Sequence, residues 1–306
     1  MTPLAAAIQI VGGIAAAPLL PGTIQTLKAR LQGRRGPSPL QPYRELRRLW
    51  GKSLVDPQPT TIVYAAAPCA VAAATAFALL LIPIAGVAPD WSLGNDALVL
   101  VGLLALARFA LAAAAWDTGS GFALIGSSRD LTLAVFAEAL LVLAIVLAAL
   151  PTGSTDLLSM SAAANGWSSW SEPAHWCAAA AFGLVILVET GRQPIDNPDT
   201  HLELTMIHEG PLLEYAGRDL ALLEWSAAAR HWIVLVLGAE LFLPHWGGFG
   251  GQLACLGAGL AFLCAALALT ETAQAKVRIL SAPTLLAGGC LLALVGLASW
   301  LVGGLV

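Results

Sequence analysis

The sequence predicts an all-α integral membrane protein with eight transmembrane helices in a single membrane domain, residues 1–306. Composition is the first reason: hydrophobic residues make up 58% of the chain and charged residues only 11%, against about 25% charge in a soluble domain. Mean hydropathy is +0.78. The second reason is that apolar runs of about 20 residues, enough to cross a bilayer as a helix, recur along the chain. An alanine-rich soluble helical bundle is the alternative, and these runs argue against it.

Each expected span is an apolar window bounded by proline, glycine or charged residues. The first precedes a basic run that starts at Lys28, and the second follows the Pro57–Pro59 stretch. A loop at 85–96 precedes the third span, and a polar stretch ending at Arg129 precedes the fourth. A longer loop at 151–173 leads into the fifth, and the acidic segment 189–219 into the sixth. In order, we expect spans at 4–26, 61–84, 97–115, 131–150, 174–190, 219–243, 252–271 and 284–304.

Charge asymmetry between the loops predicts the orientation. Eight of the fifteen Lys and Arg residues lie between Lys28 and Lys52, whereas the loops at 85–96, 151–173 and 244–251 contain none. Basic loops stay on the cytoplasmic side during insertion. We therefore expect a multi-pass membrane protein with both termini outside. The first span has no basic region before it, so we expect it to be retained rather than cleaved.

The cysteines give no sign of a metal site. All five lie in apolar segments and form no CxxC pair, whereas zinc and iron–sulfur sites need clustered thiolates. We expect no metal and no cofactor bound by this chain. The lipid bilayer is the expected environment, and nucleic acid is not an expected partner.

The segment Glu189–Asp219 is the richest in ionisable residues. It contains Glu189, Asp196, Asp199, Glu203 and Glu214 with few basic residues, and Pro194 and Pro198 interrupt any helix. An ordinary solvated loop could have this composition. Irregular polar backbone at membrane depth, however, is tolerated where it lines a cavity or contacts another protein.

Charged residues also occur inside the expected spans: Arg108, Glu138, Glu224, Arg230, His231 and Glu240. Each costs about 2.5–3.5 kcal/mol in hydrocarbon on insertion scales, so it should face a partner, a water-filled cavity or the interface. Satisfied ion pairs would explain each one singly. Together, charges on several helices are typical of a hydrated proton or charge path.

Three ordered motifs resemble one family of membrane subunits. The run from Glu189 through Arg192 and Pro194 to Asp196, followed by Glu203 and Glu214, resembles the diagnostic cytoplasmic loop of the quinone-cavity subunit 1 of respiratory complex I and of group 4 nickel–iron hydrogenases. The basic stretch around Arg34 and Arg35 resembles the first cytoplasmic loop of that family. The stretch Trp116–Arg129 with Glu138 resembles the second. The resemblance covers essentially the whole chain.

The resemblance implies a complex I subunit 1-like fold and an energy-coupling role in a prokaryotic inner membrane. Hydrogenase large and small subunits carrying nickel–iron and iron–sulfur centres would dock on the cytoplasmic face, and antiporter-like membrane subunits would pack laterally. Electron transfer in that docked arm would drive proton or sodium translocation. The implied proton-coupling acids are Glu138, Glu189, Asp196, Asp199, Glu203, Glu214 and Glu224. The implied charge partners or docking residues are Arg34, Arg35, Arg129, Arg192 and Asp117.

Departures from the complex I pattern favour the hydrogenase branch, of the formate hydrogenlyase subunit 4 or hydrogenase-4 component C type. The stretches Asp117–Ser120 and His208–Gly217 resemble that branch, and His201 stands where quinone-reducing relatives usually have an acid. A quinone-binding subunit of a complex I-like oxidoreductase is the alternative within the family. A stand-alone ion transporter and a purely structural anchor are the alternatives of other classes. The hydropathy profile lacks the inverted repeat typical of secondary transporters.

Overall fold

The computed structural model describes residues 11–87, 95–196, 207–278 and 281–303, and nearly all of the secondary structure in these ranges is helical. Six helices are long and apolar enough to cross a membrane. They are α4 (Ile62–Leu81), α5 (Ala97–Asp117), α6 (Gly121–Ala149), α10 (Gly217–Phe242), α11 (Phe249–Ala273) and α12 (Ala282–Gly303). The chain is therefore a multi-pass membrane protein.

Six long helices do not confirm the expected eight spans. The fifth expected span corresponds to α9 (Pro173–Glu189), an apolar helix of 17 residues. The first expected span begins outside the described residues. Its described part is helical at 11–16 and continues as α2 (Leu19–Leu31), which extends past the expected end at 26 and includes Lys28 and Arg30.

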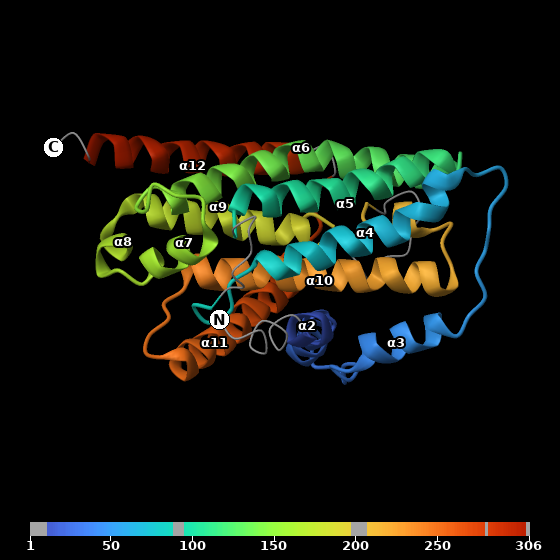
Figure 1. The fold of residues 1–306 in the computed structure, drawn as a ribbon, viewed down its shortest axis with the longest axis horizontal. Helices are drawn as coiled ribbons and strands as arrows, with labels where there is room; N and C mark the ends of the chain where they lie inside the picture. Colours follow the sequence, from blue (N-terminus) through green and yellow to red (C-terminus); the bar gives the residue numbers. More distant parts are fainter. Residues whose placement is uncertain (1–10, 88–94, 197–206, 279–280, 304–306) are drawn as a thin grey trace.

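The long helices run side by side, and α2 crosses them. In Figure 1, α4, α5, α6 and α10 lie across the view, while α2 is seen end-on. The helices α9 and α12 pack against α6, and α11 packs against α2 and α10. Both α9 and α12 have one end near the middle of the bundle, where the longer helices continue past them (Figure 1). The deepest part of the charged site described below lies at this level.

The two ends of the bundle differ in what covers them. One end carries α3 (Gln41–Trp50), a basic helix with no buried residue, and the 3-10 turn η1 (Gly210–Leu212). The other end carries the short helices α7 (Leu157–Ala164) and α8 (Trp167–Ser171) in a region that the sequence analysis treats as a loop (Figure 1). The end with α3 is called the basic end below, and the end with α7 the α7 end.

Helix α6 starts ten residues before the expected boundary at 131. The reason lies in Gly126, which brings α6 against η1: a Cβ atom on Gly126 would lie 2.7 Å from the Cα of Gly210. The early start places Arg129 and Asp130 on a helix rather than in a loop. It also turns Asp130 toward the interior, where its side chain is 13% exposed.

The starts of α4 and α5 are capped by side-chain oxygens. The Asp96 carboxylate accepts from the Leu98 N–H at 2.7 Å, and Thr61 Oγ1 accepts from the Val63 N–H at 3.2 Å. Asp117, at the end of α5, also accepts from the backbone N–H groups of Thr61 and Tyr64 at 2.7 and 3.1 Å. These bonds satisfy donors that an α-helix leaves free at its first turn, so Asp117 fixes the start of α4 against the end of α5.

Candidate functional site

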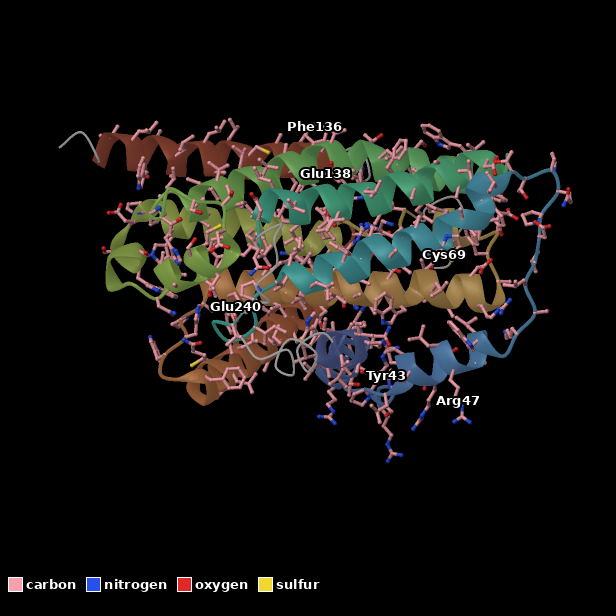
Figure 2. All side chains as sticks on the ribbon, in the orientation of Figure 1. Tyr43, Arg47, Cys69, Phe136, Glu138 and Glu240 are labelled. Carbon is pink, nitrogen blue, oxygen red and sulfur yellow. The ribbon has the colours of Figure 1, made fainter. Side chains whose placement is uncertain are left out.

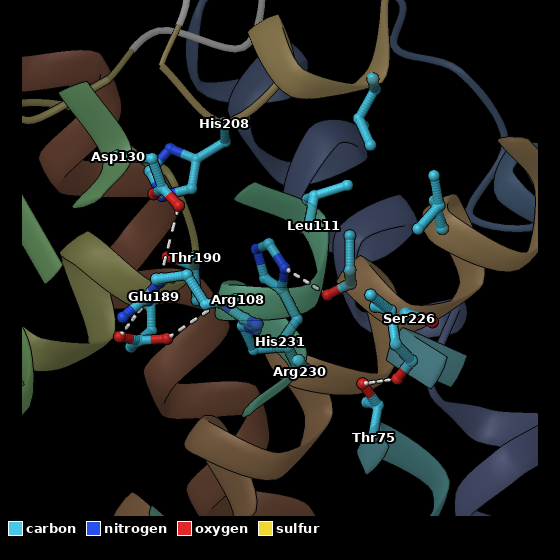
Figure 3. Close-up of a pocket in the computed structure, with 15 residues that line it drawn as sticks. Thr75, Arg108, Leu111, Asp130, Glu189, Thr190, His208, Ser226, Arg230 and His231 are labelled. Atoms are coloured by element: carbon cyan, nitrogen blue, oxygen red, sulfur yellow. Dashed lines mark hydrogen bonds and ion pairs between the residues drawn. The ribbon is translucent and has the colours of Figure 1, made fainter. Parts of the chain in front are cut away.

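Arg108 is the centre of the buried charge network. Its guanidinium is 4% exposed and contacts three carboxylates from two helices. Nη2 lies 2.7 Å from Glu189 Oε1, Nη1 lies 2.9 Å from Glu138 Oε1, and Nε lies 3.6 Å from Asp130 Oδ2. Figure 3 shows Arg108 beside Glu189, with Asp130 beyond them. Helix α5 contributes the arginine, α6 contributes two of the acids and α9 ends at the third.

A second arginine completes this group. Arg230 Nη1, from α10, lies 3.5 Å from Glu189 Oε2. Glu189 is thus held between two guanidinium groups and its side chain is 1% exposed. Charge would be costly at such a buried position without this pairing. Two arginines face three carboxylates here, so this group of five holds one negative charge more than positive when all its members are ionised.

His208 lies where an additional positive charge would balance the group. Its Nε2 is 3.6 Å from Asp130 Oδ1, and its Nδ1 is 3.2 Å from Asp196 Oδ2. Burial alone would lower the pKa of His208, but the hydrogen bond that His208 donates to Asp196 and the charges of Asp130 and Asp196 outweigh it and raise that pKa. A raised pKa favours the charged imidazolium, so His208 can supply the missing positive charge by binding a proton.

Asp196 connects the site to the segment after α11. Lys276 Nζ donates to Asp196 Oδ1 at 2.8 Å. Burial would raise the pKa of Asp196, but the hydrogen bonds and charges of His208 and Lys276 hold it well below the usual range. Asp196 is therefore an anchored anion, and His208 is the member of this pair whose pKa is raised and which can take up a proton.

A neighbouring ion-pair group joins α2 and α11 to the same region. Arg192 Nη1 lies 3.2 Å from Glu271 Oε1, and Lys28 Nζ lies 3.5 Å from Glu271 Oε2. All three residues are buried. His231 Nε2 is 3.5 Å from Arg192 Nε, which places the histidine between the two groups. Charged side chains from α2, α5, α6, α9, α10 and α11 therefore meet within one part of the bundle.

A cavity of about 110 Å³ lies among these side chains. That volume is enough for several water molecules, and the polar lining offers them partners. Apolar residues of α4, α5 and α10 form one wall (Figure 3). The ionisable lining consists of Arg108, Asp130, Glu189, His208, Arg230 and His231. Ionisable side chains within a membrane that pair with one another and border a cavity able to hold water are typical of proton pathways.

The structure brings some predicted acids together and separates others. Glu138, Glu189 and Asp196 join the network. Asp199 and Glu203 lie outside the described residues. Glu214 is half-buried, and its backbone carbonyl accepts a 2.7 Å hydrogen bond from the Tyr64 hydroxyl. Glu224 is exposed on α10.

The predicted basic residues also divide into two groups. Arg192 lies in the interior, paired with Glu271 as described above. Arg34 and Arg35 are exposed after α2, with Arg34 contacting Gln32, and Arg129 is half-buried on α6. The arginine that pairs with Glu138 and Glu189 is thus Arg108, to which the sequence analysis gives no partner.

Sequence reasoning missed Asp130, Glu271, Lys28 and Lys276 as members of these networks. Asp130 follows Arg129 and was counted with the loop, and Glu271 stands at the expected end of a span. A charged residue within one turn of an apolar helix end was the available signal, because such a residue needs a partner when the helix end is buried.

Comparison with known proteins matches the chain to the family model described as NADH dehydrogenase over residues 4–301. Hydrogenase-4 component C of Escherichia coli K12 is 34% identical over 240 residues, covering 78% of this chain and 75% of that protein. Formate hydrogenlyase subunit 4 of the same organism is 31% identical over 280 residues, covering 89% of this chain and 90% of that protein. An NADH-quinone oxidoreductase subunit of Chlorobaculum tepidum is 27% identical over 152 residues, covering 48% of this chain and 42% of that protein.

Among solved structures, a chain of the membrane-bound sulfane sulfur reductase, an archaeal respiratory membrane complex, has the same fold. Its TM-score is 0.83 at 22% identity, and the match covers 96% of this chain and 97% of that chain. At this identity the likeness concerns the fold alone.

Proposed function

Because the chain belongs to the NADH dehydrogenase family, we propose that it anchors a peripheral redox arm to the membrane and couples electron transfer there to proton or sodium translocation. Its two relatives at 34% and 31% identity are components of hydrogenase-4 and of formate hydrogenlyase. The chain is a membrane subunit of a respiratory-type complex. In this proposal the arm consists of hydrogenase-type large and small subunits, which carry the nickel–iron and iron–sulfur centres. Antiporter-like membrane subunits pack beside this chain within the membrane.

One observation carries the coupling proposal: a single guanidinium, that of Arg108, is shared by Glu138, Glu189 and Asp130 beside a hydratable cavity. When one of these carboxylates binds a proton, it loses its negative charge and no longer forms an ion pair with Arg108. The ion pairs between Arg108 and the other carboxylates then become stronger. A change of charge or position at the cytoplasmic loop would bias this competition through His208, which contacts both Asp130 and Asp196. Chains of acids and histidines within a membrane mark proton relays in pumps and transporters.

We propose that the basic end faces the cytoplasm and that the exposed Arg34 and Arg35 contribute to docking of the arm there. Arg129, in the first part of α6, and Glu214, just after η1, lie toward this end. Asp199 and Glu203, which belong to the acidic segment 189–219, are the other proposed members. Exposed charges on one face favour association with an oppositely charged partner. The membrane would be the inner membrane of a prokaryote, with both termini outside.

Quinone binding is the alternative within the family, since a relative named as part of an NADH-quinone oxidoreductase matches part of the chain. The described cavity of about 110 Å³ is smaller than the roughly 300–1,000 Å³ of typical ligand pockets. The described residues therefore fit water better than a quinone ring. The names of the relatives at 34% and 31% identity, as components of hydrogenase-4 and of formate hydrogenlyase, favour a subunit of a larger assembly over a stand-alone transporter.

The decisive experiment uses the intact complex in sealed vesicles with Glu138→Gln. Glutamine preserves shape and can still accept a hydrogen bond from Arg108, but it cannot carry the titrating proton. We expect normal subunit content and electron transfer, with redox-driven ion movement reduced by about 10²-fold or more. Glu45→Gln is the matched control, because the side chain of Glu45 on α3 is 40% exposed and pairs with Arg48 outside the central network. Unimpaired ion movement in Glu138→Gln, or loss of assembly with coupling intact in the surviving complex, would contradict the relay role.

A further inference from the structure

A second buried polar group lies at the α7 end, away from the central network. Ser161 of α7, Glu240 near the end of α10 and His245 just after α10 are 1%, 2% and 5% exposed. Figure 2 shows Glu240 at the α7 end of α10. Ten residues separate Arg230 from Glu240 on this helix, or about 15 Å along its axis. The side chains from Ile233 to Leu237 between them are buried and apolar.

The serine hydroxyl joins the carboxylate to the imidazole. Ser161 Oγ lies 2.8 Å from Glu240 Oε2 and 3.0 Å from His245 Nε2. The far ends are held by the backbone. Glu240 Oε1 accepts from the Ala85 N–H at 2.9 Å, and His245 Nδ1 lies 2.9 Å from the Leu243 carbonyl oxygen. Ala85 has a φ of 54°, an uncommon conformation for a residue with a side chain, and this conformation aims its N–H at Glu240.

Counting hydrogens shows that this group holds one more proton than Ser161 supplies. A carbonyl oxygen only accepts, so the contact with Leu243 assigns a hydrogen to His245 Nδ1. The two short contacts of Ser161 then each need a hydrogen, and the hydroxyl has only one. The second comes either from His245 Nε2, giving imidazolium and carboxylate, or from Glu240, giving a neutral pair. Without it, lone pairs would face each other at hydrogen-bond distance in a buried site, which is unfavourable.

We propose that Glu240, Ser161 and His245 form a proton-storage site that exchanges one proton with the aqueous phase at the α7 end. The proton passes between Glu240 Oε2 and His245 Nε2 through the Ser161 hydroxyl, which gives up one hydrogen as it takes another. A cavity of about 10 Å³ borders Glu240 and His245, close to the volume of one water probe. The next residue, Trp246, is 67% exposed. The role of the Glu240–Ser161–His245 site as the outlet of a translocated proton rests on the proposed function above.

Infrared difference spectroscopy on the intact complex in sealed vesicles tests the site without relying on turnover. The pH on the α7 side is stepped while the other side is held constant, and the carboxyl and imidazole bands are recorded. We expect a signal from this group that Glu240→Gln removes. Ser161→Ala should keep both end groups but uncouple them, so that the Glu240 and His245 signals no longer change together. It removes only one hydroxyl, so it keeps the test valid if Glu240→Gln fails to assemble.

Glu172→Gln is the matched control, because Glu172 is an exposed carboxylate at the same end. If neither band responds to the α7-side pH, or if Ser161→Ala leaves the coupled response unchanged, the proposal is overturned. Measuring ion movement in the Glu138→Gln and Glu240→Gln variants distinguishes a failure of the outlet role from a failure of the proposed function. If Glu138→Gln stops ion movement and Glu240→Gln does not, the outlet role fails while the proposed function stands. If neither variant affects ion movement, both fail.

Discussion

Arg108 donates a 2.7 Å hydrogen bond to Glu189, and their side chains are 4% and 1% exposed. This contact joins α5 to the end of α9 in the middle of the bundle. Removing one partner of a buried ion pair leaves an uncompensated charge, whereas removing both does not. The contact therefore affects stability in a way that differs between single and double variants.

The first prediction concerns this pair. Arg108→Met should lower the free energy of unfolding by about 3–5 kcal/mol, because Glu138 and Glu189 lose their main partner. Adding Glu189→Gln should recover part of the lost free energy of unfolding. Thermal unfolding of the detergent-solubilised complex in a double-mutant cycle measures this coupling. Arg35→Met, at an exposed position, should change stability by no more than about 0.5 kcal/mol. Strictly additive effects of the two core substitutions would contradict the pairing.

The second prediction concerns the close approach of α6 and η1. Gly126→Ala would place a Cβ atom 2.7 Å from the Cα of Gly210, and backbone atoms on both sides leave little room to move. We expect a loss of about 1–3 kcal/mol and increased protease sensitivity near His208. Gly102→Ala is the control, because Gly102 lies inside α5 with nothing within 4 Å of its would-be Cβ. That substitution should be neutral or stabilise by about 0.5–1 kcal/mol. Equal stability of the two variants would contradict the packing.

The third prediction concerns pH. The lowered pKa of Asp196 makes its contribution to stability present above about pH 4 and lost as the pH falls through its folded value. The raised pKa of His208 makes its contribution present below about pH 6.5 and lost as the pH rises through its folded value. Burial and the charge of Arg108 lower the pKa of His208, whereas the charges of Asp130 and Asp196 raise it.

The pair should therefore stabilise the protein most between about pH 4 and 6.5. Thermal unfolding measured at rising pH should show a loss of stability above that window. His208→Gln should flatten this loss, and Asp196→Asn should do the same by removing the partner that raises the pKa of His208. A wild-type slope retained in His208→Gln would show that another group is responsible.

Much of the fold can be predicted from hydropathy, but the burial of the charged side chains within the bundle cannot. The positions of the helices now seen as α4, α5, α10, α11 and α12 were predicted to within a few residues, because their apolar runs end at loops. The early start of α6 was missed because Ser127, Ser128, Arg129 and Asp130 read as a loop. In the structure this stretch is helical and buried on one side, where Gly126 packs against Gly210, which is distant in sequence.

The partners of the acidic residues were harder to predict than the acids themselves. Glu138, Glu189 and Asp196 were predicted as coupling acids, which stays a prediction, but a sequence gives no distance between Arg108 and residues 30 and 81 positions away. Helix packing decides which arginine meets which acid. For the same reason, Ser161 gave no signal, because one serine in an apolar stretch becomes informative only when Glu240 and His245 lie beside it.

The fourth prediction concerns orientation. Ser38 lies before α3 at the basic end, and Ser154 lies before α7 at the opposite end. Single cysteines introduced at Ser38 and Ser154 should react with a membrane-impermeant thiol reagent from opposite sides, Ser38 from the cytoplasm. Gly250, which has open space around it, provides a second site expected to label like Ser154. The unsubstituted protein controls for its five native cysteines. Labelling of Ser38 and Ser154 from the same side would reject the proposed topology.

The last prediction concerns docking of the peripheral arm at the basic end. Arg34 and Arg35 are exposed, and so are Arg47 and Arg48 on α3 (Figure 2 labels Arg47, which points away from the bundle). If Arg34 and Arg35 contact the arm directly, reversing both to Glu should release it while the membrane subunit stays inserted, because like charges would then face each other at the interface. Subunit content after mild-detergent purification measures release, and higher salt should weaken the wild-type contact.

Arg47→Glu with Arg48→Glu makes the same change in net charge at a neighbouring site and is the matched control. Direct contact predicts that only the Arg34 and Arg35 reversal releases the arm, since exposed charges more than about 10 Å from a partner are largely screened at 0.1 M salt. Equal release by both double variants would instead indicate a general electrostatic attraction to this face. Full retention of the arm by the Arg34 and Arg35 variant would move the docking contact to another part of the basic end.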